Sequence, residues 1–197
     1  SLNSLTTLNT QSPYDFKYTH DFDTNGLLYF LGTNGLANSQ WLNPAAHNSL
    51  VKLSVADSAR QLAVGRCEDF LSRTSVNCHT SGDDKRVWFC IDLGVNLIPT
   101  HYTLRYSKAT NYGVSSSGGS AAQSGLIKTA PRNWALLASK TGGSTPQEWC
   151  ILMMHSQDDR LREYGQTATW ELLNQEVVRK ERESNGAGWR FFRVQQT

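Results

Sequence analysis

Short apolar runs, each ended by turn-forming residues, are the feature that most constrains the fold of this chain. The run 87–93 ends at Gly94, and the runs 133–139 and 149–154 flank a Gly-, Ser- and Pro-containing connection at 141–146 that is typical of a hairpin. Further runs of the same kind lie at 27–31, 50–55, 97–106, 167–173 and 189–195. Short strands without long helices indicate an all-β fold, namely a jelly-roll β-sandwich with about eight main strands.

Two segments test this pattern. The apolar run 27–31 lies between turn signals at 25–26 and 32–35, and we expect it to be a strand. The stretch 172–183 contains good helix formers but no sustained apolar stripe. We interpret it as a solvated excursion between strands rather than a helix of the core.

Length and charge limit the domain organisation and the classes of partner. A chain of 197 residues suits one β-sandwich, which we place at 14–197 after a flexible, Ser/Thr/Asn-rich lead-in at 1–13. The net charge of +2 gives no general attraction to nucleic acid. No run approaches the length of about 18 apolar residues that a membrane span needs. We therefore expect neither a nucleic-acid partner nor a membrane span, and we expect the domain to be cut from a longer protein.

The cysteines and histidines do not suggest a metal centre or an active site. The four cysteines (Cys67, Cys78, Cys90 and Cys150) include no Cys-x-x-Cys pair, and the histidines show no metal-binding spacing. The chain also lacks the G-x-S-x-G turn of a serine hydrolase. We expect reduced thiols, an intracellular protein and no enzymatic activity.

Several of the strands resemble those of discoidin, or coagulation factor 5/8 C-type, domains. The run Trp88–Gly94 is similar to the W-x-x-x-D-L-G strand of that family, and Trp189–Val194 is similar to its closing strand. Between them, 133–140, Gly142-Gly143 and Trp149 resemble the hairpin of the family. The resemblance covers about 14–197 and implies a galactose-binding-domain-like jelly roll.

The N-terminal part resembles an intracellular branch of that family. The segments Asp21–Phe30 and Trp41–Pro44 look like those of discoidin-like domains in BTB adaptor proteins and HECT-type ubiquitin ligases. The terminal cysteine pair of the secreted members is missing. The resemblance therefore implies a cytoplasmic or nuclear module, one that recruits substrates within a ubiquitin ligase.

One acidic motif raises the question of calcium. Asp21, Asp23 and Asn25 match the first half of a calcium-binding loop, but Gly32 stands where a full EF-hand loop needs glutamate. An Asx-rich turn is the simpler interpretation, and a weak structural calcium site is the alternative. We expect no other cofactor.

Long polar connections predict where a partner binds. The segment 107–129 is rich in Ser, Gly and Ala, and we interpret it as a flexible insertion. If the strands alternate in direction, this insertion, the segment 66–87 and the loop 156–166 gather at one end of the sandwich. Binding residues concentrate on loops that a rigid scaffold holds. The candidate binding residues at this end are Arg73, Asn77, His79, Arg105, Arg132, His155, Asp158 and Asp159.

We expect these residues to bind a protein or peptide ligand, because arginine offers several donors to carboxylates and peptide carbonyls. Two alternatives remain. A carbohydrate- or lipid-binding, lectin-like domain would need exposed aromatic side chains at the loop tips, for which Tyr112 and Tyr164 are the candidates. An architectural domain of a larger protein would instead expose a large apolar patch.

Overall fold

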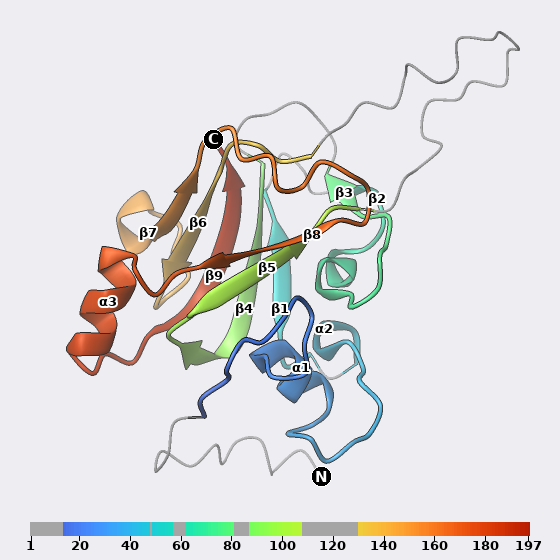
Figure 1. The fold of residues 1–197 in the computed structure, drawn as a ribbon, viewed down its shortest axis with the longest axis horizontal. Coiled ribbons are helices and arrows are strands. Elements are labelled where there is room, and N and C mark those ends of the chain that lie inside the picture. Colours follow the sequence, from blue (N-terminus) through green and yellow to red (C-terminus); the bar gives the residue numbers. More distant parts are fainter. Residues whose placement is uncertain (1–13, 48, 57–61, 81–86, 108–129) are drawn as a thin grey trace, which may run out of the picture.

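The computed structural model describes residues 14–47, 49–56, 62–80, 87–107 and 130–197, and Figure 1 shows their arrangement. The predicted lead-in 1–13 lies outside the described residues, as does the predicted insertion 107–129 apart from its first residue. The strands are β1 (Lys52–Val55), β2 (Leu62–Val64), β3 (His79–Thr80), β4 (Trp88–Leu97), β5 (His101–Arg105), β6 (Trp134–Ser139), β7 (Cys150–His155), β8 (Thr167–Glu171) and β9 (Trp189–Gln196). The helices are α1 (Leu27–Gly32), α2 (Pro44–His47) and α3 (Glu176–Glu183), with 3₁₀ turns η3 (Cys67–Leu71) and η4 (Pro146–Glu148).

Antiparallel strands form the two layers of the molecule. The larger layer is a five-stranded sheet in the order β1-β4-β9-β6-β7, and the ribbon β5-β8 crosses in front of it (Figure 1). A second ribbon, β2-β3, lies beside them. The predicted all-β class and the jelly-roll β-sandwich are confirmed.

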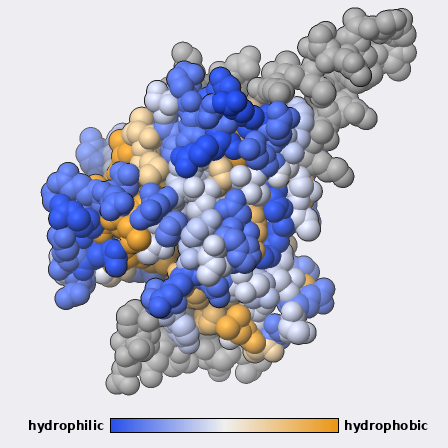
Figure 2. All heavy atoms as spheres, viewed as in Figure 1, coloured by the Kyte–Doolittle hydropathy of each residue, from blue (hydrophilic) through white to orange (hydrophobic). Residues whose placement is uncertain are grey.

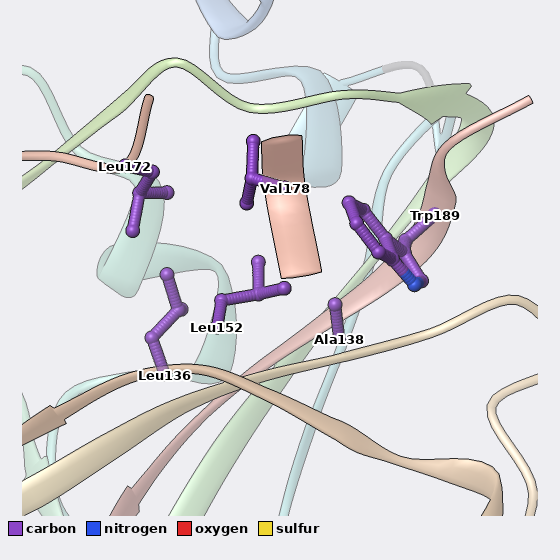
Figure 3. Packing of buried hydrophobic residues seen from close by; sticks show 6 residues of the cluster. All are labelled: Leu136, Ala138, Leu152, Leu172, Val178 and Trp189. Atoms are coloured by element: carbon purple, nitrogen blue, oxygen red, sulfur yellow. The ribbon is translucent and has the colours of Figure 1, made fainter. Parts of the chain in front are cut away.

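Buried side chains fill the space between the layers. One cluster joins Leu136 and Leu152 of the five-stranded sheet to Leu172, which follows β8 (Figure 3). A second cluster joins Trp134 of β6 to Trp170 of β8, and both indoles are 1 % exposed. Burial of such large side chains contributes about 2–3 kcal/mol each, so the sheets are held together mainly by hydrophobic contact.

Both predictions for the less regular segments are wrong. The run 27–31 is not a strand but helix α1, which buries Phe30 and Leu31. Its residues are apolar throughout, and a continuous apolar run does not distinguish a buried helix from a buried strand. The stretch 172–183, interpreted as a solvated excursion rather than a helix of the core, contains helix α3, and Val178 of this helix is fully buried in the first cluster (Figure 3). Val178 thus attaches to the core a helix whose other residues are mostly charged, and Glu181 of this helix also pairs with Lys140.

The turn predicted after Gly94 also lies elsewhere. Strand β4 continues through Gly94 to Leu97, and the chain reverses at 98–100 before β5. Gly94 has a φ of 70°, a conformation that glycine adopts without steric cost, so it allows an irregular register with β9 instead of ending the strand.

No helix among the described residues is both long and apolar enough to cross a membrane.

Candidate functional site

Hydrogen bonds link four segments that are distant in sequence, near the C-terminal ends of β5 and β7 and the N-terminal ends of β6 and β8. The backbone N–H of Asp158 donates to the carbonyl of Arg132 at 2.9 Å, and that of Gly165 donates to the carbonyl of Tyr106 at 3.1 Å. The Arg105 guanidinium donates to the carbonyl of Arg73 at 2.6 Å. The loops around 73, 105, 132 and 157–165 therefore form one connected surface, which we call the loop end.

Arg73 and Arg105 attach the N-terminal segment to this end. Arg73 donates to the carbonyl oxygens of Phe22 and Asp23, the latter at 3.2 Å. The Arg105 guanidinium lies over the Phe22 ring, 3.9 Å from its centroid, a favourable cation–π contact. Burial and the neighbouring charge of Arg73 lower the pKa of Arg105. Both guanidinium groups are thus largely used in holding the chain together.

The calcium candidates do not converge on one point. The Asp21 carboxylate accepts hydrogen bonds from the hydroxyl groups of Thr167, at 2.6 Å, and Thr169 on β8. The Asp23 carboxylate accepts from the backbone N–H of Asn25 at 3.0 Å, the contact of an Asx turn. Partial burial raises the pKa of both carboxyl groups, but their hydrogen bonds outweigh it and the net shift is downward. No group of three or more His, Cys, Asp or Glu side chains suited to a metal is found within the described ranges.

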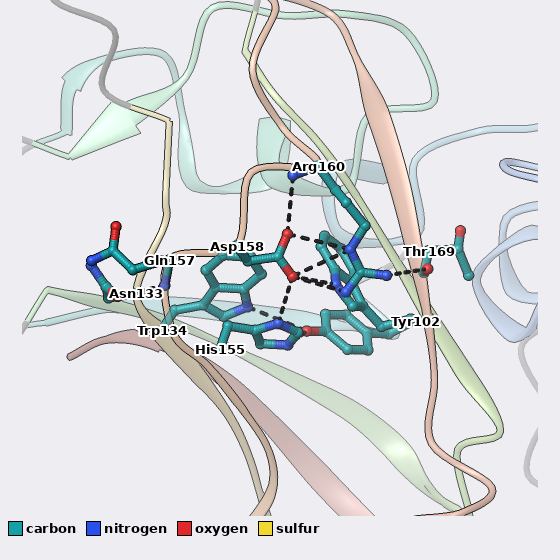
Figure 4. Close-up of polar contacts among 9 residues, drawn as sticks. Tyr102, Asn133, Trp134, His155, Gln157, Asp158, Arg160 and Thr169 are labelled. Carbon is teal, nitrogen blue, oxygen red and sulfur yellow. Dashed lines mark hydrogen bonds and ion pairs between the residues drawn. The ribbon is translucent and has the colours of Figure 1, made fainter.

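A buried polar network lies directly beneath the loop end (Figure 4). One oxygen of the Asp158 carboxylate accepts hydrogen bonds from His155 Nδ1 at 3.0 Å, Trp170 Nε1 at 2.8 Å and Arg160 Nη2 at 2.8 Å. Its other oxygen accepts from the backbone N–H of Arg160 at 3.0 Å. This carboxylate, 11 % exposed, therefore joins β7, β8 and the loop between them.

The hydrogen-bond partners assign the proton of His155. The Asp158 carboxylate can only accept, so His155 Nδ1 carries a proton and donates to it. In the neutral imidazole, Nε2 then accepts the proton of the Tyr102 hydroxyl, 2.5 Å away, and that hydroxyl accepts from Trp134 Nε1 at 3.2 Å. Burial lowers the pKa of His155 even though Asp158 favours its charged form, and the imidazole is neutral.

The Tyr102 hydroxyl, the His155 imidazole and the Asp158 carboxylate follow the order of a hydrolase triad. Unlike the imidazole of such a triad, the His155 ring is buried and a substrate cannot reach it. The His155 side chain is 3 % exposed and stacks on Trp134, with the ring centroids 4.0 Å apart. Both of its ring nitrogens are already hydrogen-bonded. The sequence placed His155 at a loop edge as a recognition residue, whereas the structure buries it beneath the loop, where it fixes Asp158.

The remaining candidates differ in exposure. Arg132 and Asp159 are exposed at the loop end, and Asp159 forms a surface ion pair with Arg162. Asn77 is half-buried, and its side-chain oxygen lacks a hydrogen-bond partner within the described part of the chain. His79 lies on β3 by its backbone, but its side chain is outside the description. The loop end thus brings together Arg73, Arg105, Arg132, His155, Asp158 and Asp159 from the predicted set.

The supporting residues were not predictable from local sequence patterns; they are Tyr102, Trp134, Arg160 and Trp170. Tyr102 and His155 are far apart in sequence, and only the packing of the two layers brings them together. The available signal was indirect, since Trp134 and Trp170 lie in strands next to polar loops and a buried indole N–H needs an acceptor. Of the aromatic lectin candidates, Tyr164 stacks on Tyr106 at 4.9 Å, and Tyr112 lies outside the described residues.

Comparisons with known proteins place similar sequences in ubiquitin ligases. The chain is 40 % identical over 157 residues to "E3 ubiquitin-protein ligase Ufd4" of Drosophila melanogaster. The aligned residues make up 79 % of this chain and 5 % of that protein. It is 36 % identical over 184 residues to "E3 ubiquitin-protein ligase hecd-1" of Caenorhabditis elegans, covering 92 % of this chain and 6 % of that protein. The chain thus spans only a small part of the length of these relatives.

Two further matches are more distant. "BTB/POZ domain-containing protein At2g30600" of Arabidopsis thaliana is 25 % identical over 163 residues, which cover 79 % of this chain and 17 % of that protein. A solved structure, "CpGH89CBM32-6 produced by Clostridium perfringens", aligns with a TM-score of 0.42 and 12 % identity over 79 % of this chain and 90 % of that chain. No protein-family model matches the sequence.

Proposed function

We propose that this chain is a non-catalytic, intracellular binding module of a ubiquitin ligase and that its loop end recognises a protein or peptide partner. The observation that carries the proposal is that hydrogen bonds connect four loop segments into one surface, and that the buried network centred on Asp158 holds the loop 157–160 of that surface in place. The similarity to two ubiquitin ligases supports the proposal that the domain is part of such a ligase. Within a ligase, we propose that it recruits substrates.

The network supports recognition because it holds the loops without occupying their outer surface. Hydrogen bonds from His155, Trp170 and the backbone of Arg160 hold the Asp158 carboxylate on the inner side of the loop. The backbone at 157–160 therefore keeps one conformation before a partner binds. A loop that is ordered in advance loses less conformational entropy on binding. The stabilising residues are therefore positioning residues, and contact with the partner is left to their exposed neighbours.

Arg132 and Arg162 are the neighbours best suited to that contact. Both are exposed at the loop end, and Arg132 makes no side-chain hydrogen bond or ion pair with other described residues. A guanidinium group binds carboxylates and peptide carbonyls through several donors at once. We therefore propose a partner that presents acidic side chains or a chain terminus to this end.

The test uses the 197-residue chain as bait for quantitative affinity capture from cell lysate. The loop-end variant carries Arg132→Glu and Arg162→Glu. The control variant carries Arg179→Glu and Arg182→Glu, the same change in charge on the exposed surface of α3, away from the loop end (Figure 1). We expect the loop-end variant to lose specific partners that the control retains. Equal capture by both variants would contradict the proposed site.

A further inference from the structure

The outer face of the five-stranded sheet, opposite the core, can be identified from the strand register. Cys90 pairs with Arg193, Arg193 with Leu137, and Leu137 with Ile151, and paired residues project to the same side of an antiparallel sheet. Phe192, the residue before Arg193 on β9, packs against the core clusters. Successive side chains of a strand point to opposite faces, so Arg193 points away from the core. Arg193, Leu137 and Ile151 therefore lie together on the face turned away from β5 and β8.

A β-bulge in β7 adds a second apolar side chain to this face. Leu136 pairs with Met153 and Leu137 with Ile151, so Leu152 is an extra residue on β7. Leu152 and Met153 both pack toward the core, which leaves Ile151 and Met154 on the outer face, 50 % and 56 % exposed. Figure 2 shows hydrophobic surface along the side of the molecule where β7 lies. Strand β7 is also the edge strand of the sheet, and it carries no charged residue or proline.

Arg193 is held between two tryptophans on this face. Its guanidinium carbon lies 4.2 Å from the ring centroid of Trp88 and 3.9 Å from that of Trp149. The two indoles fix the plane of the guanidinium group. Burial lowers the pKa of Arg193, which means that the cation has lost part of its hydration.

The charge of Arg193 is not neutralised by the described part of the chain. Its Nε is buried without a hydrogen-bond acceptor, and the neighbouring polar group is the Cys90 thiol, which is only a weak partner. The carboxylate of Asp92, on the same face, is already bound by both Nε and Nη2 of Arg190, at 2.6 and 2.8 Å. A partly desolvated guanidinium without a carboxylate is a site for an incoming anion.

We propose that this outer-face site, formed by Trp88, Leu137, Trp149, Ile151, Met154 and Arg193, binds an acidic, amphipathic polypeptide segment of a partner protein. One carboxylate of the segment pairs with Arg193, and its apolar side chains cover Ile151 and Met154. Arg193 and Ile151 lie two strands apart, so the carboxylate and the apolar contact are separated by about 10 Å. The surface is distinct from the loop end and does not depend on the function proposed for that end.

Charge complementarity selects this occupant over two others. A second copy of the chain meeting the same face would bring two Arg193 cations together, which is unfavourable. Nucleic acid needs several cations along a phosphate backbone, whereas the outer-face site offers one cation among apolar side chains. An acidic and apolar polypeptide satisfies both parts of the surface.

The test begins with selection of short random peptides, displayed on phage, against the immobilised 197-residue chain. The affinity of the best selected peptide is then measured by calorimetry for the wild type and for the double variant Ile151→Ser, Met154→Ser. The control variant is Leu36→Ser, since Leu36 is an apolar residue that is 62 % exposed outside the five-stranded sheet. A matched peptide carries Asn and Gln in place of Asp and Glu.

We expect the selected peptides to be rich in acidic and apolar residues. Their affinity should fall at least about tenfold in the double variant and in the amide peptide, and remain unchanged in the control. The proposal is overturned if the double variant binds as tightly as the wild type, if the amide peptide binds equally well, or if selection enriches no peptides. Self-association of the wild type in sedimentation experiments, abolished by the double variant, would instead identify a second copy as the occupant and also overturn it.

Discussion

Within the described ranges, arginine lies on tryptophan at the loop end and on the outer face of the five-stranded sheet, and these two places differ in whether a carboxylate pairs with the arginine. At the loop end, Arg160 lies over Trp170 at 4.5 Å and is paired with the carboxylate of Asp158. On the outer face, Arg193 lies between Trp88 and Trp149, and no carboxylate among the described residues reaches it. The first arrangement contains its anion, whereas the second receives none from the described residues.

This difference separates stability from recognition. Removing a member of a satisfied buried network leaves other groups without partners, so its cost appears in the free energy of unfolding. Removing a cation that has no anion leaves no group newly unpaired, so its cost appears only when a ligand supplies the anion. The two sites should therefore respond differently to the same substitutions.

The largest effect is expected at Asp158. Replacing it with alanine leaves His155 Nδ1, Trp170 Nε1 and Arg160 without their acceptor. We expect the free energy of unfolding, measured with urea, to fall by about 3 kcal/mol. The control is Asp159→Ala at the exposed neighbouring residue, which should cost less than about 0.5 kcal/mol. Similar losses for both variants would argue against the network.

Tyr102→Phe should have a smaller effect. The variant keeps the ring that stacks on Trp170 at 5.0 Å but removes the hydroxyl between Trp134 and His155. We expect a loss of about 1–2 kcal/mol in the free energy of unfolding. Tyr14→Phe, at a residue that is 61 % exposed, should leave the stability unchanged. A neutral result for Tyr102→Phe would show that the hydroxyl does not link the two layers.

Acidification should weaken the network through His155. Burial lowers its pKa below the ordinary value of 6.5, although Asp158 opposes this shift and Arg160 reinforces it. The unfolded chain therefore binds a proton more readily than the folded chain, so stability is full above pH 6.5 and declines as the pH falls below it. Urea unfolding at about pH 7.5 and about pH 5.5 should show the loss, and His155→Asn should reduce this dependence. A wild-type stability that is constant between these two values would refute the assignment.

The smallest effect on stability is expected at Arg193. Arg193→Met removes two cation–π contacts but also removes a partly buried, unneutralised charge, so the free energy of unfolding should change by less than about 1 kcal/mol. The matched substitution Arg160→Met deprives Asp158 of its counter-ion and should cost more, about 1–2 kcal/mol. Equal costs in urea unfolding would remove the distinction between the two sites.

The sequence was sufficient for the parts of the fold that depend on local patterns. Trp88–Gly94 and Trp189–Val194 are strands in the structure, and the hairpin around 141–146 lies where its Gly and Pro residues predicted it. The sequence did not distinguish helix α1 from a strand, because residues 27–31 are apolar throughout. It also underestimated α3, because only one of its residues, Val178, is buried in the core.

The candidate sites were less predictable because they depend on pairs of residues that are distant in sequence. Counting strand reversals placed Arg73, Arg105, Arg132 and Asp158 at one end, where the structure has them. The count did not show that His155 turns inward, since this depends on Trp134 and Trp170 from two different layers. The sequence did not predict a site at Arg193, because its stacking partners Trp88 and Trp149 are distant in sequence.

The measurement that most directly tests the account compares wild-type and Arg193→Met protein for affinity to a selected acidic peptide and for urea unfolding. The account predicts that peptide affinity falls at least about tenfold while the free energy of unfolding changes by less than about 1 kcal/mol. Unchanged peptide affinity in the variant would contradict the claim that the outer face of the sheet awaits a partner's carboxylate.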